Sequence, residues 1–203
     1  LDRHPLEIAT AGVNLSQLAI GVLGVLVITG EYSTGQIRST FAAVPHRLPV
    51  LWGKTIVYGA VTFALMLAAS LVAFFGSQPI LRQHHVQTSF SAPHVARCVV
   101  GAALFMTVAG LLGLALGALV RNTAGGIATF AGVMFVLPGI TAILPNSWGD
   151  SISPYLPLNA GTSIIALHAD PHTLTAWPGY LLFCAYTIGA LAVSAVLLIR
   201  RDA

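Results

Sequence analysis

Histidine, the commonest metal ligand among side chains, gathers in the polar stretches of this sequence. Six of the seven lie in segments that the charge pattern described below predicts to be external: His4, His84, His85, His94, His168 and His172. The adjacent His84 and His85 could bind a metal together with His94 or His172. However, no HxxxH pair and no acidic ligand accompanies them. We therefore expect solvated histidines and no metal site.

Ser163 and Cys184 are the candidate nucleophiles. Neither lies in a Gly-x-Ser-x-Gly turn, the chain has no HExxH pattern, and no apolar run carries a base that could activate either residue. A phosphate-binding loop ending in Gly-Lys-Ser/Thr is also absent. The sequence therefore predicts a protein that is not an enzyme and that has no cofactor of its own.

Composition indicates that membrane helices position these residues. Of the 203 residues, 56% are hydrophobic and 7% are charged, whereas about a quarter are charged in soluble domains. A helix needs about 20 apolar residues to cross a bilayer core. We predict an all-α membrane protein, a polytopic transmembrane helix bundle forming a single domain over residues 1–203. Its five spans lie near residues 13–29, 50–75, 98–120, 124–144 and 179–199.

The remaining charge and cysteine content indicates no further partner or site. Nine Lys+Arg against six Asp+Glu give a net charge of +3, without a basic cluster of binding length, so no nucleic-acid partner is expected. Cys98 and Cys184 lie in apolar runs, without the spacing of a metal site or a disulfide framework. We interpret them as buried thiols.

Basic residues near the span ends predict the orientation, because they favour the cytoplasmic side. With residues 30–49 inside, six basic residues are cytoplasmic and three are external: Arg38, Arg47, Lys54, Arg121, Arg200 and Arg201 against Arg3, Arg82 and Arg97. We therefore expect a plasma-membrane protein with residues 30–49 and the C-terminus in the cytoplasm and residue 1 outside. Residues 1–12, 77–96 and 145–178 are then external. Within the last of these, residues 160–167 are apolar but too short to span, which fits either a helix on the bilayer surface or a shallow re-entrant segment.

The polar segment between the first two spans has its own helical pattern. Apolar residues at Ile37, Phe41, Val44 and Leu48 share one helical stripe. Ser33 followed by Gln36 is typical of a capping box, and Pro45 and Pro49 stop a helix and favour re-entry. We predict a short cytoplasmic amphipathic helix near residues 33–45. It either lies in the lipid interface or forms a docking surface for a soluble partner.

Small residues and a proline mark two spans. Gly113 and Gly117 have GxxxG spacing and Gly110 precedes them, while Gly21 and Gly24 lie in the first span. They fit packing within the chain or a seam between two copies. Pro138-Gly139 in the fourth span predicts a kink, which is either a gating hinge or a simple bend.

No span carries Asp, Glu or His near its middle, where a transporter driven by protons or sodium usually places them. With no phosphate loop either, the driving force for any transport has to come from another polypeptide. A protein that only recruits a cytoplasmic partner, as a membrane scaffold or sensor, is the alternative function.

Three stretches resemble, in the same order, the permeases of type-2 ABC transporters of the actinobacterial kind. They are VLGVLVITGEYSTGQIRSTFAAVPHRLPVLWGK at 22–54, RNTAGGIATFAGVMFVLPGI at 121–140 and ILPNSWGDSISPYLPLNAGTSI at 143–164. Such permeases have six spans with both termini inside, so the resemblance implies that the first span is missing from these 203 residues.

The resemblance also implies an exporter of a hydrophobic or amphipathic substrate, with membrane lipids around it. Its partners would be a second permease copy or a homologous permease and a cytoplasmic ABC ATP-binding subunit that carries ATP and Mg. By position, the coupling role falls to Glu31, Tyr32, Ser33, Gly35, Arg38 and Phe41. Glu31 would pair with a basic residue of the partner, and Arg38 with an acidic one.

Overall fold

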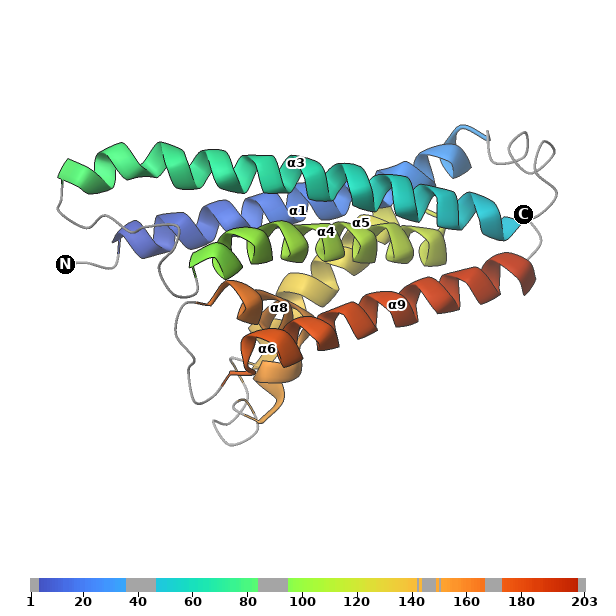
Figure 1. Ribbon diagram of the computed structural model, residues 1–203. Helices are drawn as coiled ribbons and strands as arrows, with labels where there is room; N and C mark the ends of the chain where they lie inside the picture. Colours follow the sequence, from blue (N-terminus) through green and yellow to red (C-terminus); the bar gives the residue numbers. More distant parts are fainter. Residues whose placement is uncertain are drawn as a thin grey trace. The chain divides into compact units, whose positions relative to one another are not determined.

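A computed structural model shows the chain as helices joined by short connections (Figure 1). It describes residues 4–35, 47–83, 95–141, 143, 149, 151–166 and 173–200. Every element in these residues is helical, which confirms the all-α prediction for the described part of the chain. The longer helices are α1 (His4–Ser33), α3 (Arg47–Gln83), α4 (Val95–Val120), α5 (Thr123–Ala131) and α9 (Ala176–Arg200). The shorter elements are the π-helix η1 (Gly132–Val136), α6 (Leu137–Thr141), the 3-10 helices η2 (Ser153–Tyr155) and η3 (Ser163–Ile165), and α8 (Pro157–Thr162).

Five helical stretches are long and apolar enough to cross a membrane, as predicted for a multi-pass membrane protein. They are Gly12–Ser33, Leu48–Gln78, Val95–Val120, Thr123–Thr141 and Ala176–Arg200. The sequence placed the helix ends too early: α3 continues to Gln83, into the expected polar loop 77–96. Residues 4–12, expected to precede the first span, belong to α1. Extending an existing helix adds one hydrogen bond for each residue fixed, so polar residues readily continue it beyond the apolar run.

The contacts of the chain divide it into two compact units, each made from parts of several helices. Unit 1 comprises Leu1–Gly59, Val108–Val133 and Tyr186–Ala203. Unit 2 comprises Ala60–Thr107 and Met134–Ala185.

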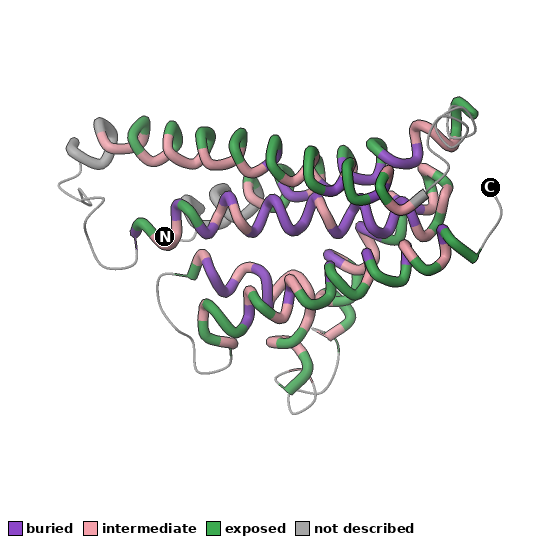
Figure 2. The backbone as a smooth tube through the Cα atoms, turned by 45° about the vertical axis from the view of Figure 1, so that its right-hand side comes forward, coloured by how far each residue is buried: buried purple, intermediate pink, exposed green. Residues whose placement is uncertain are grey.

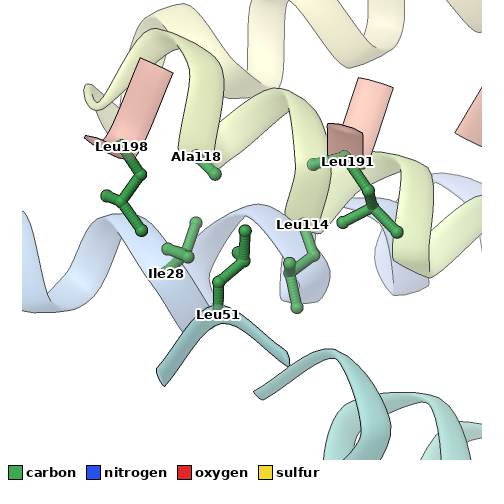
Figure 3. Packing of buried hydrophobic residues seen from close by; sticks show 7 residues of the cluster. Ile28, Leu51, Leu114, Ala118, Leu191 and Leu198 are labelled. Atoms are coloured by element: carbon green, nitrogen blue, oxygen red, sulfur yellow. The ribbon is translucent and has the colours of Figure 1, made fainter. Parts of the chain in front are cut away.

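Unit 1 has an apolar core built from four helices, shown in Figure 3. Its buried residues come from α1, α3, α4 and α9: Ile28, Leu51, Leu114, Ala115, Ala118, Leu191 and Leu198. The side chains of Tyr32 and Tyr58 pack against this cluster. Because apolar contact alone does not favour helix association in lipid, close packing and polar contacts have to hold these helices together.

Glycines let α1 and α4 approach each other closely in unit 1. A Cβ atom on Gly24 would meet the carbonyl oxygen of Gly110, and one on Gly113 would meet the backbone of Gly21. Gly117 likewise faces Val25. These glycines are therefore covered by the chain's own helices and form a contact within one chain.

In unit 2, the short segment α8–η3 packs among the membrane helices. Ala160 and Ile164 are fully buried, and Gly161 faces the rings of Phe105 and Phe183, whose centroids are 5.7 Å apart. Arg97 donates from Nη2 to the carbonyl oxygen of Ala166 at the end of η3, over 2.7 Å. The segment is therefore packed against α4 and α9.

The backbone of the fourth span changes form just before Pro138. The π-helix η1 occupies Gly132–Val136, and α6 follows it. Pro138 has no backbone N–H, and its ring clashes with the carbonyl four residues earlier, that of Met134. A π-helical turn widens the helix at this position. The sequence predicted a kink at Pro138, and the structure has this π-helix just before it.

Burial differs sharply between the membrane helices. Of the 18 most apolar consecutive residues in α4, 72% are buried, whereas 6% of the corresponding residues in α3 are buried. Figure 2 shows exposed and intermediate residues along most of the described part of α3. α4 is thus the more buried of these two helices.

Candidate functional site

The end of α1 and the start of α3 flank residues 36–46 and are joined directly. The Nζ atom of Lys54 lies 2.7 Å from Oε1 of Glu31 and donates to the carbonyl oxygen of Val27 over 2.9 Å. The two side chains are only 18% and 24% exposed. Lys54 therefore holds a carboxylate and a backbone carbonyl of α1 at once.

Tyr32, the next residue of α1, connects the same helix end to two other elements. The guanidinium carbon of Arg121 lies 5.7 Å from the centroid of the Tyr32 ring, within the range of a cation–π contact. Arg121 also donates from Nη2 to the carbonyl oxygen of Leu197 in α9, over 3.2 Å. We call Glu31, Tyr32, Lys54 and Arg121 the α1-end cluster.

Arg121 occupies an unusual backbone position in the turn between α4 and α5. Its φ is +56°, in the left-handed region that non-glycine residues seldom adopt. Its N–H bonds to the carbonyl oxygen of Gly117 over 2.9 Å, which closes the last turn of α4. Asn122 then caps α5, because its side chain accepts a hydrogen bond from the N–H of Gly125. This tight turn presents the guanidinium to both α1 and α9.

Further polar contacts join the helices beneath the cluster. Thr123 donates to the hydroxyl of Thr29 over 3.0 Å, the hydroxyl of Tyr58 donates to the carbonyl of Ile20 over 2.6 Å, and Ser194 donates to the carbonyl of Ala115 over 2.9 Å. Hydrogen bonds between membrane helices contribute about 0.6–2 kcal/mol each. Unit 1 is therefore joined by polar contacts at several levels.

Charge at the α1-end cluster is only partly compensated within the described chain. A carboxylate at the C-terminal end of a helix is disfavoured by the helix dipole, and Lys54 offsets this at Glu31. The second carboxylate oxygen, Oε2 of Glu31, is buried and has no hydrogen-bond partner among the described residues. The carboxylate can therefore accept one more donor.

The structure describes four of the six residues expected to take the coupling role. Glu31 and Tyr32 belong to the α1-end cluster, where Lys54 of the same chain provides the basic partner that was expected from another protein. Ser33 ends α1, and its hydroxyl donates to the carbonyl of Gly30 over 2.9 Å. Gly35 has a φ of +72°, which glycine adopts without strain and which turns the chain after α1.

Several other predictions for this region lie outside the described residues. They concern Arg38 and Phe41, the second half of the proposed capping box, and the amphipathic helix over residues 36–45.

Of the other predicted site residues, Gly113 and Gly117 face α1, as described above. Pro138 follows the π-helix. Gly139 has no other atom within 4 Å of a Cβ placed on it, so a side chain fits there without a clash.

Among the residues first considered for chemistry, Ser163 has hydrogen-bond partners in the structure. The hydroxyl of Ser163 donates to the carbonyl oxygens of Ala160 and Ala176, at 2.7 and 3.2 Å. Cys98 and Cys184 are free thiols of intermediate exposure, so the expectation that they are buried is wrong. In the described part of the chain, no three His, Cys, Asp or Glu residues lie close enough to hold a metal ion. The side chains of the seven histidines lie outside the described residues.

Sequence reasoning missed three residues of this region. Lys54 was used for orientation, although a lone lysine near the end of an apolar run also predicts an acidic partner. Arg121 follows directly after a glycine-rich apolar run, where a left-handed turn residue closes a helix. Gln17, in the first span, was passed over because only ionisable residues were sought there.

Five helices long and apolar enough to cross a membrane indicate a multi-pass membrane protein. No protein-family model, curated protein or solved structure matches the chain. What the protein does is therefore inferred from its residues and their geometry.

Proposed function

We propose that the chain is a permease subunit of an ATP-driven ABC transporter, coupled to a separate ATP-binding subunit through residues 31–47. It exports a hydrophobic or amphipathic molecule from the cell. It works as a pair with a second permease, and the ATP-binding subunits dock on the cytoplasmic face.

The observation that carries this proposal is the attachment of both helices that flank residues 36–46. The Glu31–Lys54 ion pair joins the end of α1 to the start of α3. A partner that moves residues 36–46 would therefore move α1 and α3 together. Through Tyr32 and Arg121, the same end of α1 also contacts α9. This is the mechanical requirement for a coupling segment that transmits the movement of a soluble partner.

Electrostatics at the same end support a docking role. Oε2 of Glu31 is buried beside Lys54 without a donor among the described residues. An Arg or Lys donor from a partner, or from residues 36–46, would complete the carboxylate with a charge-assisted hydrogen bond. Glu31 would then bind two basic groups: Lys54 of the same chain through Oε1 and the second donor through Oε2.

The sequence supports an external source of energy. No Asp, Glu or His lies near the middle of a span, and the chain has no phosphate loop. Of the charged residues in the α1-end cluster, Glu31 and Lys54 pair with each other, while Arg121 contacts Tyr32 and Leu197. ATP hydrolysis on a partner subunit would supply the work.

Reconstitution tests the proposal against the alternative scaffold or sensor. The complex is purified in mild detergent from cells that express the chain at its natural level, transferred to lipid nanodiscs and assayed for ATP hydrolysis. Co-purification of a protein with a phosphate loop, whose ATPase rate depends on the permease, supports a transporter. A stable cytoplasmic partner without a phosphate loop supports the scaffold and contradicts the proposal.

A further inference from the structure

Gln17 is a fully buried amide within the first membrane span. Its side chain is 0% exposed, and neither Nε2 nor Oε1 has a hydrogen-bond partner among the described residues. Leaving an amide unpaired in an apolar environment costs roughly 2–7 kcal/mol, depending on the reference state. So large a cost favours a partner that is not among the described side chains.

The face of α1 that carries Gln17 packs closely against other helices of unit 1. Gln17 shares a face of α1 with Gly21 and Gly24, four and seven residues further along. A Cβ on Gly21 would meet the Phe130 ring, and one on Gly113 would meet the Gly21 backbone. One turn from Gln17, the Tyr58 hydroxyl donates its proton to the carbonyl oxygen of Ile20.

Five other buried polar side chains form hydrogen bonds within their own helix or helical segment, unlike Gln17. Thr29, Thr55, Thr107, Ser163 and Ser194 each donate to a backbone carbonyl three or four residues earlier, over 2.7–2.9 Å. A hydroxyl on a short stem reaches the preceding turn of its own helix. A glutamine amide carries two donors and one acceptor at the end of a longer stem, so it needs a partner that both donates and accepts.

We propose that Gln17 binds a small, uncharged polar group through its amide. That group is a water molecule, or the hydroxyl or amide group of a mainly apolar molecule. A charged ligand is disfavoured, because burying a charge without a charged partner costs far more than burying a neutral group. The site lies about 7.5 Å along α1 from Gly12, at 1.5 Å per residue, so it is near one end of the span. The inference does not depend on the proposed function.

The sign of a stability change tests this proposal. Gln17→Met keeps the length of the side chain and removes its polarity. If a ligand pairs with the amide, Gln17→Met loses those hydrogen bonds and lowers the melting temperature of the full chain in nanodiscs by about 4 °C or more. The matched control is Asn14→Leu, which changes an exposed amide of the same helix. A higher melting temperature for Gln17→Met would mean that the amide is simply unpaired, and would overturn the proposal.

Two measurements on the wild-type chain separate the possible ligands. Solid-state NMR of protein labelled with ¹⁵N-glutamine detects transfer of magnetisation from water to the Gln17 amide, which Gln17→Glu identifies by removing its nitrogen signal. Mass spectrometry of an organic extract detects a compound carried by the wild-type chain and lost from Gln17→Met. Water transfer supports a bound water, and a lost compound supports a hydroxyl or amide of an apolar molecule. If neither is found, the proposal is wrong whatever the sign of the stability change.

Discussion

The amino group of Lys54 lies 2.7 Å from Oε1 of Glu31 and also bonds to the carbonyl of Val27. One lysine near the start of α3 thereby fixes the last turns of α1. Residues 36–46 connect these same two helices in the chain. A partner that binds residues 36–46 would therefore act on the end of α1 and the start of α3, which the Glu31–Lys54 pair already joins.

Breaking the Glu31–Lys54 pair should destabilise the protein. Glu31→Gln and Lys54→Met are each expected to cost about 1–2 kcal/mol, between the values for exposed and fully buried pairs, because the two side chains are partly buried. This corresponds to about 2–8 °C in the melting temperature measured in nanodiscs. The double variant should lose less than the sum of the two single losses.

A matched control is Arg200→Gln, which removes an exposed basic residue at the end of α9 and should leave the melting temperature unchanged. Additive losses in the double variant would show that the two charges do not stabilise each other.

Arg121 offers a test of backbone strain. Arg121→Ala removes the contacts with Tyr32 and Leu197 but keeps the left-handed backbone, and should cost about 2–3 kcal/mol. Arg121→Gly removes the same contacts and relieves about 1 kcal/mol of left-handed strain. The glycine variant should therefore melt at a higher temperature than the alanine variant. The opposite order would mean that the backbone at Arg121 is not left-handed.

Close packing of α1 on α4 predicts which glycines tolerate alanine. Gly24→Ala and Gly113→Ala would each push a methyl group into backbone atoms and should cost about 2 kcal/mol or more. Gly189→Ala in α9 meets no atom within 4 Å and should be neutral or stabilising by up to about 1 kcal/mol. Melting temperatures of the three variants in nanodiscs test this ranking. A neutral or stabilising effect at all three positions would indicate that helix propensity, rather than packing, decides the outcome.

The segment after α1 should control coupling to the partner. Proline cannot adopt the φ of +72° found at Gly35, so Gly35→Pro should redirect the chain entering residues 36–46. Gly35→Pro and Arg38→Glu are both expected to lower the permease-stimulated ATPase rate of the reconstituted complex at least several-fold, while the chain still inserts into the membrane.

Arg200→Glu is the charge-reversal control for Arg38→Glu, since both residues are predicted to face the cytoplasm, and it should leave stimulation intact. Full stimulation by both Gly35→Pro and Arg38→Glu would contradict a docking role for this segment.

The sequence predicted the five membrane helices well because their apolar runs are long and nearly free of charge. The kink predicted at Pro138 rested on a missing donor and a ring clash, which are local properties, and a π-helix precedes that residue. It did not predict that α8–η3 packs against Phe105 and Phe183. Both residues are far from Gly161 in the sequence, so no local pattern indicates the contact.

The candidate site was predicted less well, for the same reason. Glu31 was expected to find its basic partner in another protein, but Lys54, in the next membrane helix, lies beside it. A partner 23 positions away has no local signal in a single sequence. Gln17 was missed because an uncharged amide changes neither the charge pattern nor the helical periodicity. Only its burial without a partner among the described residues distinguishes it.

Photo-crosslinking from residues 38 and 41 tests the central claim most directly. A photoreactive amino acid is placed at Arg38 or Phe41 in the full chain and irradiated in intact membranes. The attached protein is then identified by mass spectrometry. Val57, which is exposed in the apolar part of α3, is the control position. The account predicts a crosslink from 38 and 41, and none from 57, to a cytoplasmic protein with a phosphate loop and ATPase activity. Crosslinks only to lipid or to an external protein would contradict it.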